Sequence, residues 1–383
     1  MLRVFFTEFL GNSPVWFKTL ILAFLVASYP LTLILGETIM GWAFILMFIM
    51  TLALALKCYP LQSGGLLALA VLAIGLTTPE TVWYEINQNL GVIMLLVFMV
   101  SFIFFMKPLL IYIFGKILMK VKNKVILSMM FSFAAAILSA FLDALTVMAV
   151  LITVFVALYG VYEKVHSMAG GAVAVNDDSV DMGGDTLSEF RAFIRSLVMH
   201  GAIGTALGGV MTQVGEPQNL LISEKMDWNF IEFAMQMTHV TIPTLIAGLG
   251  MVVVLEIFGK KFGYGTKLDD GVRKVLEDYL HEEDQKRTLV EKYGLIVQGL
   301  CGLLLIIGLA LHVMEVGLVG LSLLVLVTAF TGINHESRIG PAFEESLPFV
   351  SLLCIFFVIV GMIHDQHLFT PVIEWVLAMD IEA

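Results

Sequence analysis

One charged residue, Asp143, stands in the otherwise uncharged apolar stretch 125–160. In a bilayer, an ionised carboxylate is costly unless it is paired, and such a residue by default marks an ion or proton pathway. Ser139 and Thr146 stand close to it in the sequence and are included as candidate oxygen ligands. The stretch therefore predicts an ion or proton pathway through Asp143. A carboxylate that only caps helix N-termini at a hairpin turn remains an alternative, although Asn or Ser would cap at less cost.

A second group of polar residues interrupts the segment 192–223, where Gly215 and Pro217 flank Glu216. Proline removes a backbone donor and frees a carbonyl group, so the helix is expected to unwind near 212–219. Unwound carbonyls within a membrane are tolerated where they line a cavity, and they suit Na⁺ or Li⁺ as hard oxygen ligands. The alternative is a glycine-rich helix that packs closely on its neighbours. The residues predicted to form this part of the ion site are Thr212, Gln213, Gly215, Glu216, Pro217, Gln218 and Asn219.

Other chemistry has weaker support. His200 lies within an apolar span and is a candidate proton relay, although a buried histidine bonded to a carbonyl group is favoured over that role. The three cysteines Cys58, Cys301 and Cys354 are irregularly spaced and predict neither disulfides nor a metal site. The sequence lacks HExxH, GxSxG and a paired intramembrane Asp motif, so an enzyme is not expected. No cofactor is expected, and no metal beyond transported Na⁺.

Composition identifies the elements that must position these residues. Hydrophobic residues make up 59% of the chain and charged residues 14%, whereas charged residues are about 25% of an ordinary soluble domain. Several uncharged runs approach the roughly 20 residues that a membrane helix needs. A nucleic-acid partner is not expected from the net charge of −11. The prediction is an all-α polytopic membrane protein with the lipid bilayer as its surroundings. The clearest runs are Thr19–Gly36, Ile39–Leu56, Leu90–Met106, Leu295–Leu311 and Leu347–Ile363.

The distribution of basic residues predicts the orientation. If 125–160 enters and leaves on one side, a cytoplasmic N-terminus places all 21 Lys and Arg residues except Lys225 in the cytoplasm. The positive-inside rule therefore favours an even number of crossings in that stretch. Whether it forms a re-entrant hairpin or two full spans is left open. Residues 161–190 are expected to be a flexible loop, and residues 269–292 a cytoplasmic surface helix.

A weak internal repeat is also present. Glu85 aligns with Glu344, and the same offset aligns Phe98 with Phe357. The two copies have opposite predicted orientations, as an inverted-topology repeat requires. The predicted division is an N-terminal helix at 1–38, a first repeat at 39–258 that contains the hairpin 125–160 and the broken helix 192–223, a cytoplasmic linker at 259–293, and the opening helices of a second, incomplete repeat at 294–383.

Five segments carry a family resemblance: SAFLDALTV (139–147), GTALGGVMTQVGEPQNLLI (204–222), LALKCYPLQSGGLLAL (54–69), FGYGTKL (262–268) and GPAFEESLPF (340–349). Together they resemble the NhaB-type Na⁺/H⁺ antiporters of the ion transporter superfamily, over essentially the whole chain. In such an antiporter, Asp143 is expected to bind a proton and Na⁺ in turn. The resemblance implies inverted repeats, each with a re-entrant hairpin and a broken helix, and export of Na⁺ in exchange for H⁺. Asp143 and the run Gly215–Asn219 fall on the hairpin and broken-helix motifs.

The resemblance also carries a departure, since family members continue into a second hairpin and a second broken helix. The chain is therefore expected to be a truncated form or a fragment. The resemblance implies a multi-pass protein of the bacterial inner membrane with Na⁺ or Li⁺ and H⁺ as transported ions. A homodimer stays open, as do two alternatives in function, a Na⁺-coupled carboxylate or arsenite carrier of the same superfamily and an inactive truncated product.

Overall fold

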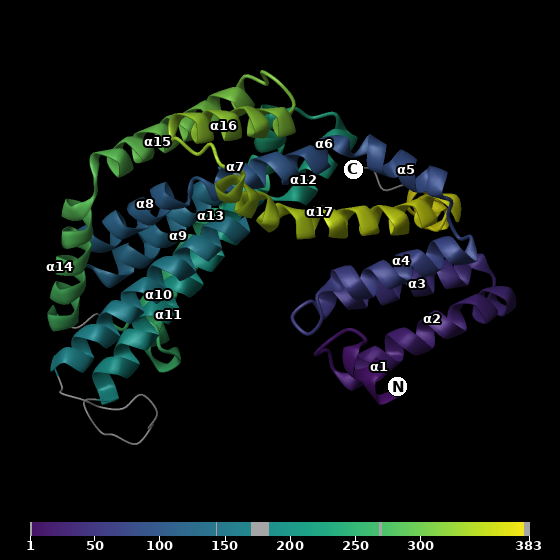
Figure 1. Ribbon diagram of the computed structural model, residues 1–383, viewed down its shortest axis with the longest axis horizontal. Coiled ribbons are helices and arrows are strands. Elements are labelled where there is room, and N and C mark those ends of the chain that lie inside the picture. The colour runs from purple at the N-terminus through teal and green to yellow at the C-terminus, as the bar shows by residue number, and fades with distance from the viewer. Residues whose placement is uncertain (1, 143, 170–183, 268–269, 379–383) are drawn as a thin grey trace. The chain divides into compact units, whose positions relative to one another are not determined.

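The computed structural model describes residues 2–142, 144–169, 184–267 and 270–378, and all regular elements among them are helices (Figure 1). The chain divides into two compact units, unit 1 (Met1–Ile93 with Glu344–Ala383) and unit 2 (Met94–Phe343). In chain order the elements are α1 Leu2–Glu8, α2 Val15–Leu35, α3 Glu37–Ala53, α4 Pro60–Ile74, α5 Pro79–Gln88, α6 Leu90–Met94, the π-helical turn η1 Leu95–Met99, α7 Val100–Phe104, α8 Lys107–Lys120, α9 Lys124–Phe141, α10 Ala144–Ala169, α11 Gly184–Gly209, α12 Pro217–Met226, α13 Phe230–Phe258, the 3₁₀ turn η2 Gly259–Phe262, α14 Asp270–Lys286, α15 Leu289–Ala310, α16 Val316–Phe330, α17 Glu336–Asp365 and α18 Thr370–Ala378.

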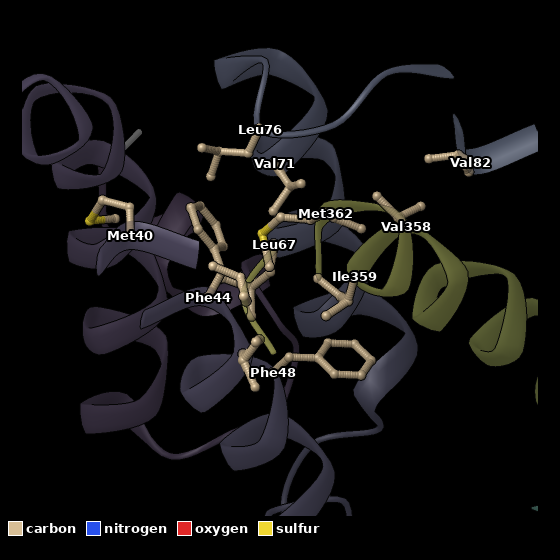
Figure 2. Packing of buried hydrophobic residues seen from close by; sticks show 13 residues of the cluster. Met40, Phe44, Phe48, Leu67, Val71, Leu76, Val82, Val358, Ile359 and Met362 are labelled. Carbon is tan, nitrogen blue, oxygen red and sulfur yellow. The ribbon is translucent and has the colours of Figure 1, made fainter. Parts of the chain in front are cut away.

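Unit 1 is built on an apolar cluster shared by α3, α4 and the second half of α17. Figure 2 shows Phe44 and Phe48 of α3 beside Leu67 of α4, with Ile359 and Met362 of α17 on the same cluster. These side chains are almost fully buried. A hydrophobic residue at nearly every position of these helices supplies both this core and a large apolar outer surface, as expected for helices in lipid.

Unit 2 contains the two segments that the sequence predicts to hold an ion site. Helices α9 and α11 run parallel and in close contact. At one end, Lys124 Nζ donates a hydrogen bond to Ser196 Oγ at 2.6 Å, and at the other Thr212 Oγ1, just after α11, donates to the Ala140 carbonyl. The chain advances by the same number of residues from Lys124 to Ala140 as from Ser196 to Thr212. The two segments therefore run in the same direction with nearly the same rise per residue.

Glycine makes this contact possible between the two ends. A Cβ atom added to Gly204 would lie 2.1 Å from the Ser132 carbonyl oxygen, and one added to Gly208 would lie 1.9 Å from that of Ala136. Backbone therefore lies directly on backbone, an approach that small residues permit in membrane helix pairs. Dispersion contacts and exclusion of lipid along this line join α9 to α11.

Helix α10 runs antiparallel to this pair. Arg191 Nη2 of α11 donates to Tyr159 Oη at 2.8 Å near the end of α10, and Leu151 lies against Gly201, where an added Cβ would be 2.5 Å from Leu151 Cδ1. Helix α10 thus leads the chain back to the end where α9 began. That 125–160 leaves the membrane on the side it entered remains a prediction.

Helix α13 also runs antiparallel to α9. Its first residue, Phe230, contacts Phe141 at the end of α9 with ring centroids 6.3 Å apart. Near its other end, Glu256 accepts a hydrogen bond from Ser128 at 2.8 Å. Helices α9, α10, α11 and α13 therefore form one bundle, seen together in teal and blue in Figure 1.

The apolar runs become helices as predicted. Among the described residues, five helices are long and apolar enough to cross a membrane, or six if the bent pair of α5 with α6–α7 counts as one span. This confirms an all-α polytopic membrane protein. The division into two inverted repeats remains a prediction. The five spans are Val15–Leu35, Lys124–Phe141, Phe230–Phe262, Leu289–Ala310 and Ser346–Asp365.

Two sequence interpretations were wrong in detail. The flexible loop expected at 161–190 is helical at both ends, since α10 continues to Ala169 and α11 begins at Gly184. Good helix formers flank the Gly- and Asp-rich centre and extend both helices. The short helices α5, α8 and α18 were not predicted at all; α5 begins with Thr78 as its N-cap and proline at its first position, a signal available in the sequence.

The glycine contact gives a first prediction. The substitution Gly208→Ala places a methyl carbon 1.9 Å from the Ala136 carbonyl oxygen, so α9 and α11 must separate. Overpacking of this kind typically destabilises by about 1–3 kcal/mol. We expect a lower thermal unfolding midpoint for the detergent-purified variant. The control is Gly160→Ala on α10, where an added Cβ meets nothing within 4 Å. Equal midpoints for the two variants would contradict the close contact.

Candidate functional site

The site is built around a break in a helix. Helix α11 ends at Gly209 and α12 begins at Pro217, so the chain between them is not helical. The amide of Asn219 spans this break and donates to the Gly209 carbonyl at 2.8 Å and to the Thr212 carbonyl at 2.7 Å. It thereby satisfies two of the carbonyl groups that a helix end leaves without a partner. The break is close to the predicted 212–219, because the helix resumes at the proline, which needs no backbone donor there.

Side chains from both segments fasten the break to the end of α9. Ser139 Oγ donates to the Thr205 carbonyl at 2.8 Å, and Thr212 Oγ1 donates to that of Ala140. Gly215 folds back on the end of α11, where an added Cβ would lie 2.2 Å from the Gly209 carbonyl oxygen. The last turn of α9 and the break are therefore one packed structure rather than two adjacent ones.

Gln213 closes the far side of the break. Its amide donates to the Trp228 carbonyl at 2.8 Å and to the Ser223 hydroxyl, which itself donates to the Trp228 carbonyl at 2.6 Å. Gln213 is buried, and these bonds connect the break to the turn between α12 and α13. The sequence predicted Gln213 as an ion ligand, whereas the structure uses its amide nitrogen to hold the turn.

Glu216 is half-buried, and its carboxylate is turned toward the end of α11. A methyl group on Gly209 would lie 3.0 Å from Glu216 Oε1 and 3.3 Å from Ser139 Oγ. Gln218 is exposed and donates to the other carboxylate oxygen, Glu216 Oε2. The carboxylate of Glu216 and the hydroxyl of Ser139 therefore both lie beside Gly209 of α11, although the two residues are far apart in the sequence.

Asp143 lies outside the described residues. In the sequence it stands between Leu142, which caps α9, and Ala144, the first residue of α10. Leu142 is buried, as is Thr146 in the first turn of α10. The structure therefore brings Ser139 together with the residues of the break, while the role of Asp143, on which the predicted site centres, remains a prediction.

The helix ends at the site carry partial charges of both signs. Helices α9 and α11 end here, and α10 and α12 begin here. A helix C-terminus carries roughly half a negative charge and an N-terminus roughly half a positive one. Glu216 stands at the N-cap position of α12, where a carboxylate is favoured. The two C-termini leave carbonyl groups that a small cation can use as ligands.

A second polar cluster, not predicted from the sequence, lies at the other end of α9 and α11. Glu256 Oε1 accepts from His200 Nε2 at 2.8 Å, and Lys124 Nζ lies 3.4 Å from the same oxygen. The side chains of His200 and Glu256 are fully buried, and that of Lys124 is 4% exposed. His200 was expected to bond a carbonyl group, and its partner is instead this carboxylate.

The sequence contained part of the signal for this cluster. Glu256 follows the apolar run Met251–Leu255, and His200 lies in an apolar span. Their positions in the sequence therefore indicate that both ionisable side chains are buried. Their pairing joins residues of two helices that are far apart along the chain. Lys124 was read only as one of several loop cations. The pairing follows from the packing of α9, α11 and α13.

Comparison with known proteins bears on the function of this arrangement. The family model for bacterial Na⁺/H⁺ antiporter B (NhaB) matches residues 1–383. A protein named Na⁺/H⁺ antiporter NhaB from Teredinibacter turnerae is 53% identical over 383 residues, 98% of this chain and 76% of that protein. Proteins of the same name from Saccharophagus degradans and Pseudomonas putida are 52% and 50% identical, over 77% and 75% of their own lengths.

The chain spans about three quarters of the length of these relatives. The match to the family model confirms the family that the sequence motifs resemble, and it extends over residues 1–383. The chain is a multi-pass bacterial membrane protein and an antiporter with Na⁺ and H⁺ as its transported ions. The relatives are named as transporters rather than as enzymes. The chain belongs to the bacterial Na⁺/H⁺ antiporter B family.

Proposed function

We propose that the chain exchanges cytoplasmic Na⁺, or Li⁺, for external H⁺ at the break between α11 and α12, with Asp143 as the residue that binds the two ions in turn. The observation that carries this proposal is the packing of the break and the end of α11 onto the end of α9, through Thr212 and Ser139. Asp143 follows that end by two residues in the sequence. The proposal places the chain in the inner membrane with a cytoplasmic N-terminus.

Competition for one carboxylate is sufficient for coupled exchange. An ionised carboxylate in a low-dielectric interior is unstable unless a proton or a metal ion neutralises it. Only the two loaded forms of Asp143 then cross the membrane barrier readily, and the empty form does not. Each outward passage with Na⁺ must therefore be followed by an inward passage with H⁺, without a separate coupling device.

The other residues of the site divide into ligands and positioning residues. Glu216 and Ser139 supply oxygens that converge on Gly209, and both can complete the coordination of Na⁺. Asn219 and Thr212 use their donors to hold backbone carbonyls in place, so their proposed role is mainly to keep the break in a geometry that the ion can use. Gly215 and Pro217 permit the fold of the break.

We predict that Asp143→Asn abolishes Na⁺-dependent proton movement, because Asn cannot alternate between a charged and a neutral form. The measurement is Na⁺-induced collapse of a pH gradient in everted vesicles, followed with a pH-sensitive dye. Glu216→Gln is the companion variant and should only weaken apparent Na⁺ affinity and shift the pH optimum. Full exchange by the Asp143 variant at normal membrane levels would transfer the principal role to Glu216.

The role of Asn219 gives a separate prediction. Asn219→Ala leaves the carbonyls of Gly209 and Thr212 unsatisfied in a buried site, and an unsatisfied buried group costs about 1–3 kcal/mol. We expect a lower unfolding midpoint together with a weaker apparent affinity for Na⁺. Gln236→Ala, an exposed amide on α13, is the control. A variant with wild-type midpoint and Na⁺ affinity would show that Asn219 does not hold the break.

Single cysteines test the proposed orientation in a background lacking Cys58, Cys301 and Cys354. Cysteines at 120, 176 and 282 are expected to resist an impermeant thiol reagent in intact cells and to react in everted vesicles. These positions lie in the segments 107–124, 161–190 and 259–293. A cysteine at exposed position 225 should react in intact cells. Labelling of position 282 from outside the cell would overturn the orientation.

A further inference from the structure

The buried carboxylate of Glu256 is the centre of the second polar cluster. Its Oε1 atom accepts hydrogen bonds from His200 Nε2 and Ser128 Oγ, both at 2.8 Å, and Lys124 Nζ lies 3.4 Å away. The backbone amide of Gly265 donates to Oε2 at 2.8 Å. A carboxylate with this many donors is stabilised in its charged form. Glu256 is therefore a fixed negative charge, shared by α9, α11 and the turn after α13.

Lys124 balances that charge. Its ammonium group donates to Ser196 Oγ at 2.6 Å and lies 4.5 Å from the ring centroid of Phe193. A buried charge without compensation is strongly unfavourable, so the oppositely charged Lys124 and Glu256 stabilise each other here. With His200 neutral, the cluster has no net charge.

His200 is the member of the cluster that keeps an unused ring nitrogen. Its Nε2 atom faces Glu256, which assigns the proton of the neutral ring to Nε2. Its Nδ1 atom is buried and has no hydrogen-bond partner among the described residues. Nδ1 therefore presents an unused lone pair, and histidine is the side chain that normally gains a proton between about pH 5 and 8.

The surroundings define which charges act on His200. Lys124 faces it from α9, Glu256 from α13, and Tyr264 from the turn after η2, with the rings of Tyr264 and His200 5.4 Å apart. From α10, Leu151 packs beside it at Gly201. The exposed Arg195 of α11 itself lies against the same turn, where a Cβ added to Gly263 would be 2.6 Å from its Nη2 atom.

The cluster is close to water at one end. Helix α9 begins at Lys124, and the residues just before it, Lys122 and Asn123, are exposed. The predicted ion site is at the opposite end of the same helices. From His200 to the end of α11 at Gly209 the distance along the helix is about 14 Å, at 1.5 Å per residue. The two sites are therefore separate, and both lie on the α9–α11 pair.

We propose that His200, held between Glu256 and Lys124, is a proton-binding site separate from the Na⁺ site, and that it regulates exchange by acting on the packing of α9, α11 and α13. A proton from solution binds Nδ1 and is released there again. Binding gives the buried cluster a net positive charge and a new N–H donor without an acceptor. Both are unfavourable in a dry interior, so the helices must rearrange to admit water or a carbonyl group.

The rearrangement reaches the Na⁺ site through the glycine contact. Gly204, one turn beyond His200, rests on the backbone of Ser132, and the contact continues at Gly208 toward the break. Movement of α11 relative to α9 at the cluster therefore displaces the end of α11. Acidification accordingly lowers exchange through His200, in addition to direct competition of H⁺ at Asp143. The regulatory part rests on the proposed antiport, whereas proton binding by His200 does not.

The first experiment measures proton binding directly. The full chain, labelled with ¹⁵N-histidine and placed in lipid nanodiscs without Na⁺, is titrated by NMR between about pH 5 and 8, the range in which histidine normally changes charge. The signals missing in His200→Gln identify this residue. We expect a neutral ring with its proton on Nε2 at high pH and an imidazolium at low pH. Signals of a neutral ring down to the lowest pH would overturn the site, whether or not the chain exchanges ions.

The second experiment measures Na⁺/H⁺ exchange against pH in proteoliposomes. His200→Gln should make the fall of activity on acidification shallower, because one proton-binding group is lost. Lys124→Met should move that fall to higher pH, by about one to two units, since protonated His200 then neutralises Glu256 in place of the lost cation. A purely structural role would reduce activity at every pH alike in both variants.

The matched control is His239→Gln on the exposed face of α13, which should leave the pH profile unchanged. A wild-type profile for His200→Gln would overturn the regulatory role. If that variant fails to fold, the profile of Lys124→Met decides: a fall at the wild-type pH would overturn the proposal. Absence of exchange in the wild-type chain with a titrating His200 would contradict the proposed antiport and its regulation, and leave the proton site standing.

Discussion

The contact of backbone on backbone between α9 and α11 is the constraint on which the arrangement of unit 2 depends. It exists because Gly204 and Gly208 carry no side chain where the carbonyl groups of α9 approach. In a lipid environment the hydrophobic effect does little to join helices, so such close packing is a main source of stability. It also sets the register that places the break in α11 beside the last turn of α9 and the cluster of Glu256 beside the first.

The break itself shows how an unwound segment is tolerated among apolar helices. Each carbonyl that leaves the helical pattern needs a donor or an ion, because no water is available in the hydrocarbon layer. Asn219 serves the carbonyls of Gly209 and Thr212, while Thr212 serves that of Ala140. Polar side chains that could have been ion ligands are thereby used as structural donors. The remaining oxygens, foremost those of Glu216 and Ser139, are the ones that a cation can share.

Charge is distributed over the helix pair in two different ways. At the Na⁺ site the proposed carboxylate requires an exchangeable cation, so its charge is neutralised by the cargo. At the far end, the ammonium group of Lys124 balances the carboxylate of Glu256, and the proposed exchangeable proton is on the third member, His200. In this proposal the first site transports ions, and the second regulates exchange in response to pH. Because one rigid contact connects them, a change in protonation at His200 can alter the geometry at the break.

The sequence by itself determined the membrane class, the positions of the spans and the position of the break. These features depend on residues adjacent in the chain: an apolar run forms a helix wherever lipid is the solvent, and Pro217 restarts a helix because it needs no donor there. Asp143 was likewise conspicuous as one charge in an apolar stretch, and the family motifs agreed with that position.

Only the tertiary structure decided which polar groups meet. The pairing of Glu256 with Lys124 and His200 joins three helices, and the use of Gln213 to hold Trp228 depends on how α12 turns back. A polar residue in an apolar segment shows that it needs a partner, but many partners satisfy the local sequence equally well. The choice among them is made by the register in which α9, α11 and α13 pack, because that register sets the distances over which charges and hydrogen bonds act.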